Sequence, residues 1–327
     1  MLLATALSGV ATASAGAANI TGAGSTLVAP LLQKWKEGFE PKFGIGVTYS
    51  AVGSGTGIKD ITARTVTFGA SDAPLTPAQA GECNGCLMIP WALTATGVGY
   101  NVPGVSRLRL TGPVLAKIYL GQITNWDNAA LKKINPGVTL PNLAITPVFR
   151  SDGSGDTYAF TNYLSDVSHE WLSTKGYSTG VSFTVGTGAK GNAGVSSVVS
   201  GTSGAIGYMS AAYLIEHGIP AAEIQNAAGK YEFPNLANIE NAAEYVKKVP
   251  ANNELHIVDP PKKYKKAYPI STFSYAIVPK ATPSPGEISK FVLYAMKEGQ
   301  AFGAALDFAP IPKIVLKAGI ATAKTLT

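Results

Sequence analysis

The sequence feature that most restricts the fold is a short strand followed by a glycine turn and a helix, repeated in the N-terminal part of the chain. Strands are predicted at 18–24 (ANITGAG), 47–52 (VTYSAV) and 66–70 (VTFGA). Ser25 and Thr26 are predicted to open the first helix, and the second continues through 58–64 (IKDITAR) after a GSGTG turn. This order is typical of an α/β fold with a parallel sheet.

Later segments extend the pattern and predict two lobes. We expect one helix over 112–135, a strand at 144–149 (AITPVF) and a strongly β-prone run at 268–279 (YPISTFSYAIVP). We infer two α/β lobes, the second inserted into the first, joined by crossings near 92–100 and 268–276. The predicted boundaries are 19–95 and 273–327 for the discontinuous lobe 1, and 96–272 for lobe 2.

Residues 1–18 are predicted to be the remnant of an export signal. The stretch MLLATALSGVATASAGAA is apolar, rich in small residues and uncharged, and cleavage is expected near Ala15–Ala18. An ordinary N-terminal core helix is the alternative. Export would place the mature protein in the periplasm or another extracytoplasmic compartment.

Composition and charge limit the classes of partner. The 327 residues are 46% hydrophobic and 14% charged, which suits a folded protein of about two domains. Beyond the N-terminus, no apolar run approaches the ~20 residues that cross a bilayer. The formal net charge of +6 favours small anions, acidic membranes or nucleic acid as partners. The densest basic run, 260–266 (PPKKYKK), is predicted to be a solvated lysine face, with a nucleic-acid patch as the alternative.

The only two cysteines, Cys83 and Cys86, predict a short disulfide that staples a surface loop. A redox-active C-x-x-C motif is the alternative, although no thioredoxin-like context surrounds it. Two cysteines cannot supply the four ligands of a structural zinc site, and the three histidines are scattered along the chain. The sequence therefore predicts no metal site.

The ends of the predicted strands carry small polar residues where an α/β sheet binds its ligands. The sequences are GAGST, GSGTG and GASD, with SDGSGD after the strand at 144–149. Each turn alone is most simply a helix cap. Together with Arg150, the N–H groups and positive dipole ends of several helices predict a cage for a compact oxyanion.

Acidic residues in this cage indicate which anion it holds. Asp152 can fix the guanidinium of Arg150 through a fork of hydrogen bonds. Asp72 is different, because an ionised carboxylate only accepts hydrogen bonds. It tolerates an anion that still carries a proton, as phosphate does near neutral pH, and it opposes sulfate. A site of this kind can discriminate by ~10⁴–10⁵.

Several motifs then resemble one family in the order in which they occur. They are ITGAGSTLVAPLLQKW, VGSGTGIKDI, FGASDAPLT, KIYLGQITNWDN, RSDGSGDTYAFTNYLS, GAKGN, GAIGY and YPIST. The chain is similar to the periplasmic phosphate-binding protein of the high-affinity phosphate ABC transporter. The resemblance implies an α/β, two-lobed periplasmic-binding-protein fold of type II with two hinge crossings, no enzymatic activity and no cofactor. It also implies a monomer that delivers phosphate to a membrane permease with two permease subunits and an ATPase, with no nucleic-acid partner.

The resemblance also implies the site residues, carried over motif by motif. Asp72 would accept the phosphate proton, and Asp152 would orient Arg150 from behind. The full predicted phosphate-binding set is Thr26, Leu27 (through its N–H), Ser54, Asp72, Arg150, Ser154, Gly155 and Asp156.

Two positions depart from the pattern of the family. Leu27 stands where Phe is common, and Asp156 stands where many members have Thr. Asp156 either takes a second phosphate proton, so that affinity weakens as pH rises, or caps a helix starting at Thr157 and touches the ligand only by its N–H.

Three other functions compete with this interpretation. A phosphatase or serine hydrolase using Ser54 or Ser154 lacks a recognisable histidine partner and a nucleophile elbow. A secreted phosphate or arsenate scavenger would have an identical site and no transporter. A sulfate- or molybdate-binding protein would keep the fold, but Asp72 argues against both ligands.

Overall fold

The computed structural model describes residues 19–326, and the predicted export signal at 1–18 lies outside them. An eight-stranded sheet runs through the molecule, and a three-stranded sheet accompanies it. In spatial order the large sheet contains β2 (Gly46–Ala51), β1 (Asn19–Gly24), β3 (Phe68–Ser71), β11 (Ser271–Pro279), β4 (Cys86–Tyr100), β8 (Ala205–Ser210), β6 (Thr146–Arg150) and β7 (Thr187–Ala189). The small sheet contains β10 (Tyr231–Glu232), β9 (Glu223–Gln225) and β5 (Arg109–Leu110).

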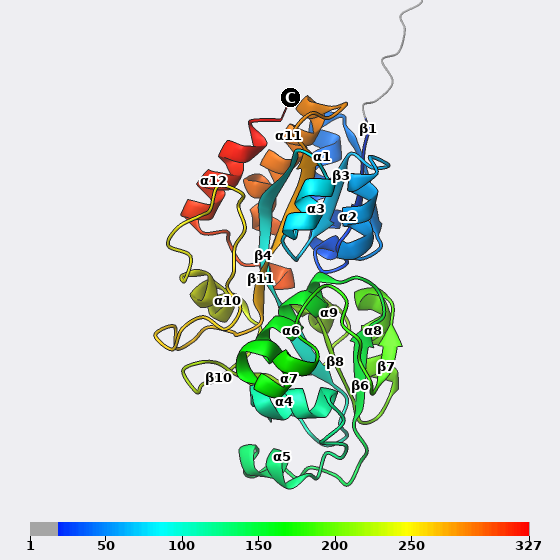
Figure 1. The fold of residues 1–327 in the computed structure, drawn as a ribbon, viewed down its shortest axis with the longest axis vertical. Helices are drawn as coiled ribbons and strands as arrows, with labels where there is room; N and C mark the ends of the chain where they lie inside the picture. Colours follow the sequence, from blue (N-terminus) through cyan, green and yellow to red (C-terminus); the bar gives the residue numbers. More distant parts are fainter. Residues whose placement is uncertain (1–18, 327) are drawn as a thin grey trace, which may run out of the picture.

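The helices gather around the two ends of the large sheet (Figure 1). Around the upper end lie α1 (Ala29–Phe43), α2 (Ser54–Thr62), α3 (Pro77–Glu82), α11 (Pro285–Met296) and α12 (Lys313–Ala323). Around the lower end lie α4 (Gly112–Tyr119), α5 (Ala129–Ile134), α6 (Gly155–Val167), α7 (His169–Thr174), α8 (Gly191–Gly201) and α9 (Ala211–Glu216). The remaining elements are α10 (Leu236–Ala243) and the 3₁₀ turns η1 (Glu298–Phe302) and η2 (Ala304–Leu306).

The large sheet is mixed, so the prediction of a parallel sheet holds only toward its two ends. β1 pairs in parallel with β2 and β3, and β6 does so with β7 and β8. The central strands β11 and β4 run antiparallel to their neighbours. Residues 86–95 of β4 pair with β11 and residues 96–100 with β8. One continuous strand therefore links the two groups of elements.

Aromatic cores hold each group of elements together. In the upper group, the rings of Trp35 and Trp91 lie 5.1 Å apart, and Trp91 meets Phe291 edge-on at 6.1 Å. In the lower group, Phe160 stacks on Tyr208 at 4.3 Å. All of these rings are essentially excluded from solvent. Tyr208 thereby reaches the end of β6 from a fixed position in the core.

The predicted start of the first helix is wrong. α1 begins at Ala29, with Pro30 in its first turn. The Ser25 hydroxyl accepts hydrogen bonds from the N–H groups of Leu27 and Val28. These local bonds hold residues 25–28 in a bend, which delays the helix and turns Ser25 toward the end of β3.

The single helix predicted over 112–135 is also wrong. α4 ends at Tyr119, and Gly121 has a φ of 75°, a conformation that ends a helix. α5 begins at Ala129 behind the Asn128 cap. Ile123 is buried in the connection between the two helices.

The predicted loop staple is present as a disulfide between Cys83 and Cys86. The guanidinium of Arg64, just beyond α2, donates to the carbonyls of Ile61 and Cys83 at 2.7 Å each. The disulfide loop is thus attached to the C-terminal end of α2, at the opposite end of that helix from Ser54.

Candidate functional site

The loops that follow β1, β2, β3 and β6 meet at one place, and their glycines allow the approach. The N–H of Gly55 donates to the carbonyl of Gly153 at 2.9 Å. A Cβ added to Gly55 would lie 3.0 Å from the Gly153 Cα, and one added to Gly155 would lie 2.4 Å from the Asp72 Cβ. The contact at Gly155 is too close for a side chain, and the one at Gly55 would force the neighbouring backbone to shift, so glycine at both positions allows the loops to approach this closely.

Asp72 lies at the centre of this junction and is 1% exposed. Its Oδ2 accepts from the Ser25 hydroxyl at 2.6 Å and from the Ser54 hydroxyl at 3.4 Å. Its Oδ1 is buried and has no hydrogen-bond partner within residues 19–326. Burial and the charge of Asp156 raise the pKa of Asp72 to about 7, against the opposing effects of the Ser25 and Ser274 hydroxyls and of the charge of Arg150. The site thus contains one buried acceptor atom that is left unsatisfied.

The hydroxyls around this carboxyl are arranged as donors. Ser54 Oγ accepts from the N–H groups of Gly155 at 3.1 Å and Asp72 at 3.3 Å. Thr26 Oγ1 accepts from the backbone and side-chain nitrogens of Asn192 at 3.2 and 2.8 Å. A hydroxyl has two acceptor lone pairs and one hydrogen. Because both lone pairs are occupied on each hydroxyl, its hydrogen must be donated. The Thr26 hydrogen is left for an anion, whereas the Ser54 hydrogen is directed to Asp72 Oδ2.

Arg150 is the buried cation of the site, with 4% of its surface exposed. The predicted fork is present: Nε and Nη2 donate to the two oxygens of Asp152 at 2.8 and 2.6 Å. Nη1 donates to Asp156 Oδ2 at 2.9 Å. Burial lowers the pKa of Arg150, but its bonds to Asp152 and the charge of Asp156 outweigh this and raise the pKa overall. Two of the five guanidinium N–H donors remain for another acceptor.

The prediction that Asp156 caps a helix starting at Thr157 is wrong. α6 starts at Gly155, and its N-cap is Ser154, whose Oγ accepts from the Thr157 N–H at 3.3 Å. The Asp156 carboxylate instead accepts from Arg150, Asn192 and Thr96, at 2.9, 2.7 and 2.9 Å. Its backbone N–H lies in the first turn of α6, where N–H groups have no intrahelical partner.

Asn192, at the start of α8, is a site residue that the sequence reasoning missed. It is fully buried, and its amide group connects Thr26 with Asp156, while its Oδ1 accepts from the Ser210 N–H at 2.7 Å. In the sequence, Asn192 belongs to the motif GAKGN, which contributed to the family resemblance but did not indicate a function for this residue. Thr96 on β4 and Tyr208 on β8 were missed as well; the Tyr208 hydroxyl accepts from the Arg150 N–H at 3.1 Å.

The structure brings the predicted site residues together at this junction, although Leu27 is placed differently from the rest. Its N–H, which was expected to donate to the ligand, donates to Ser25 Oγ at 3.1 Å, and its carbonyl accepts from Ser210 at 3.3 Å. The other predicted residues fall into adjoining hydrogen-bonded groups. Ser54, Asp72 and Gly155 form one group, and Thr26, Arg150, Asp152 and Asp156 form a second through Asn192. Ser154 bonds to Thr157, whose hydroxyl meets that of Tyr208 next to Arg150.

The network is rich in donors around one free acceptor, and its chemistry is that of an anion site. Asp152 has a lowered pKa because the bonds and charge of Arg150 outweigh its burial, so it stays ionised beside the arginine. Within residues 19–326, no cluster of three or more histidine, cysteine or acidic side chains is arranged to hold a metal ion. None of the helices in that range combines the length and apolar character needed to cross a bilayer.

Known proteins resemble this chain in fold, and in sequence over most of its length. A family model described as a PBP superfamily domain matches residues 9–304. The chain is 36% identical over 307 residues to the phosphate-binding protein PstS of Pasteurella multocida, covering 92% of this chain and 88% of that protein. It is 35% identical over 303 residues to PstS of Xylella fastidiosa Temecula1, covering 91% and 83%.

A solved structure supports the predicted fold class. The high-affinity periplasmic phosphate-binding protein PfluDING, solved with phosphate bound, superposes with a TM-score of 0.73 at 21% identity, over 93% of each chain. The two-lobed, type II periplasmic-binding-protein fold is thereby confirmed. The chain belongs to the PBP superfamily and, within it, to the family of the PstS phosphate-binding proteins.

Proposed function

We propose that this protein binds inorganic phosphate between its two lobes and delivers it to a membrane ABC permease for import. The observation that carries the proposal is Asp72 Oδ1, a buried acceptor without a partner among the described residues, placed beside Arg150. A fully deprotonated oxyanion would leave this atom unsatisfied and repelled, whereas a protonated one donates to it. The names of the PstS relatives support the same ligand.

The proposed phosphate contacts follow from the donors that the network leaves available. Thr26, Ser154, the two spare N–H groups of Arg150 and the N–H of Asp156 in the first turn of α6 would donate. Ser54 would also donate, by turning its hydrogen from Asp72 Oδ2 to the phosphate. Each charge-assisted bond contributes about 1.5–3 kcal/mol. Asp152 would hold the arginine in place, and the protein would act by binding alone, without catalysis.

The proposed lobes keep the predicted boundaries, 19–95 with 273–327 and 96–272. The bonds from Asn192 to Thr26 and from Gly55 to Gly153 cross between these two parts of the chain and support a closed arrangement. We propose an exported, monomeric protein that partners with a permease and an ATPase.

Measuring phosphate uptake by the host cells distinguishes a transport protein from a secreted scavenger. If the protein delivers phosphate to a permease, cells lacking it should lose high-affinity phosphate uptake, and the protein should restore uptake only in cells that contain the permease. Restoration without the permease would favour a secreted phosphate or arsenate scavenger.

The pH dependence of affinity tests the role of Asp156. Three donors already engage its carboxylate, which supports contact with phosphate through its N–H alone. The pKa of Asp72 is raised to about 7 by burial, and its carboxyl must be ionised to accept a hydrogen bond from the proton of hydrogen phosphate. Below about pH 7, the Asp72 carboxyl and the dihydrogen phosphate ion each hold one proton that must be released on binding. We therefore expect affinity to rise between about pH 5.5 and 7.5 and to stay level to about pH 8.5 in calorimetric titrations. Affinity that falls steadily across this range would instead show that Asp156 takes a second phosphate proton.

The variant Asn192→Ala tests how the site keeps the Thr26 hydroxyl as a donor. Losing the amide frees an acceptor position on Thr26 and removes a bond to Asp156, so phosphate affinity should fall by about 10- to 100-fold. Asn238→Ala removes a buried asparagine from α10, outside this network, and serves as the control. In a cycle with Thr26→Ala, the double variant should lose much less than the sum of the two single losses. Additive losses would show that Asn192 does not act through Thr26.

A further inference from the structure

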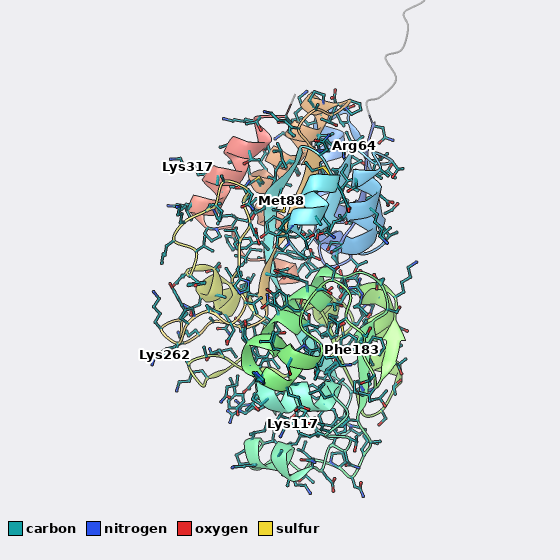
Figure 2. The ribbon with its side chains drawn as sticks, in the orientation of Figure 1. Arg64, Met88, Lys117, Phe183, Lys262 and Lys317 are labelled. Atoms are coloured by element: carbon teal, nitrogen blue, oxygen red, sulfur yellow. A yellow bond between two sulfur atoms is a disulfide. The ribbon has the colours of Figure 1, made fainter. Side chains whose placement is uncertain are left out.

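A second charged feature lies outside the anion site, on the part of the chain around α10. Seven exposed lysines from three separate segments define what we call the lysine face: Lys230, Lys247, Lys248, Lys262, Lys263, Lys265 and Lys266. Figure 2 shows Lys262 at the outer edge of the molecule, next to α10 and β10. The sequence revealed only the last four of these lysines as a run.

Hydrogen bonds and a contact between two aromatic rings join the three segments into one surface. Asn226 donates to the carbonyl of Lys265 at 3.0 Å and accepts from the N–H of Lys230 at 3.1 Å. The Tyr264 hydroxyl donates to the Glu244 carbonyl at 3.3 Å, and its ring lies 5.8 Å from that of Tyr245, just before Lys247 and Lys248. The lysine face is therefore contiguous, although its members are up to 36 residues apart in sequence.

The charge of the lysine face is only partly balanced. Segment 226–268, which holds all seven lysines, contains five carboxyls, Glu232, Glu240, Glu244, Glu254 and Asp259, so it carries a formal charge of +2. Glu232 lies close enough to Lys230 and Lys266 to feel their charges. Even so, none of the seven lysines makes an ion pair within residues 19–326. Lys263 Nζ lies over the Tyr264 ring, 5.0 Å from its centre, and none of the seven ammonium groups is neutralised by a carboxylate of the described chain.

The composition of the lysine face favours a diffuse anionic surface over a folded acidic partner. Segment 226–268 contains no arginine, the residue that recognises carboxylate and phosphate groups through a rigid fork. Lysine offers mobile point charges on apolar stems. Tyr245 is 39% exposed beside them, and tyrosine rings favour the headgroup region of a bilayer. Anionic lipid headgroups attract such lysines within a Debye length.

We propose that the lysine face docks this protein on anionic lipid headgroups at a membrane surface. This inference stands apart from phosphate binding, because the seven lysines belong to none of the contacts of the anion site. Docking would confine the protein near the membrane while leaving its anion site unchanged.

Vesicle co-flotation of the purified protein tests the proposal. The vesicles are phosphatidylcholine alone or with about 30% phosphatidylglycerol, in about 20 mM or about 500 mM salt. The test variant replaces Lys262, Lys263, Lys265 and Lys266 by Gln. The matched control replaces four exposed lysines elsewhere, Lys117, Lys133, Lys313 and Lys317, by Gln and so removes the same charge; Figure 2 shows Lys117 and Lys317 away from Lys262.

We expect the wild type and the control to bind only the anionic vesicles at low salt, and the test variant to bind at least about tenfold less. Phosphate affinity should be equal in all three, which shows that each is folded. Equal binding to both vesicle types, an equal loss in the control, or binding to soluble polyglutamate without binding to vesicles would overturn the proposal.

Discussion

Replacing Asp72 by Asn is expected to remove most of the discrimination between phosphate and sulfate. In the wild type, Oδ1 is a buried acceptor without a partner among the described residues, so a protonated anion satisfies it and sulfate does not. The amide of Asp72→Asn can keep its oxygen on Ser25 and present N–H groups to either anion. We expect a preference of ~10⁴–10⁵ to shrink by at least about 100-fold, through weaker phosphate binding and newly measurable sulfate binding.

Calorimetric titration of both anions near neutral pH measures this change. Asp166→Asn is the matched control, because Asp166 lies toward the far end of α6 and has a carboxyl whose pKa is raised by partial burial. The control should keep the wild-type preference. An Asp72→Asn variant that still excludes sulfate would assign the discrimination to the shape of the site and not to the carboxylate.

Replacing Arg150 by Gln is expected to have the second large effect, on both ligand binding and folding. Phosphate would lose two charge-assisted bonds, which corresponds to roughly 10³-fold in affinity. Asp152 and Asp156 would lose their buried partner, and the free energy of unfolding should fall by about 3–5 kcal/mol. Calorimetry and denaturant unfolding without phosphate measure the two losses separately.

A double variant separates these two roles of Arg150. In Arg150→Gln/Asp156→Asn the fully buried carboxylate is neutralised, so stability should recover in large part while phosphate binding stays lost. Arg150→Lys retains the charge without the fork and should bind phosphate better than Arg150→Gln. If Arg150→Gln bound phosphate within about tenfold of the wild type, the guanidinium would not be a ligand of the anion.

The strand ends were the part of the site that sequence could predict. Glycines and hydroxyls after consecutive strands of one sheet must lie near one another, since parallel strands end at the same edge. The fork between Arg150 and Asp152 was also predictable, because the two residues are only two positions apart. Local spacing therefore recovered the residues that belong to a single turn.

Residues brought in by tertiary contacts were beyond such reasoning. Asn192 reaches Thr26 across 166 positions, and Thr96 reaches Asp156 across 60. These contacts depend on how the central antiparallel strands β4 and β11 position the two groups of elements relative to each other. A local hydrophobic pattern in the sequence does not determine that arrangement. The late start of α1 was missed for another reason: the Ser25 hydroxyl bonds to two backbone N–H groups and competes with helix formation.

Competition between phosphate and sulfate for the wild-type protein tests the central claim most directly. In a calorimetric titration with phosphate, a roughly thousandfold excess of sulfate should leave the phosphate affinity unchanged, because Asp72 accepts only an anion that carries a proton. Displacement of phosphate by that excess of sulfate would contradict the account, since it would show that the buried carboxylate does not select its ligand by the proton it holds.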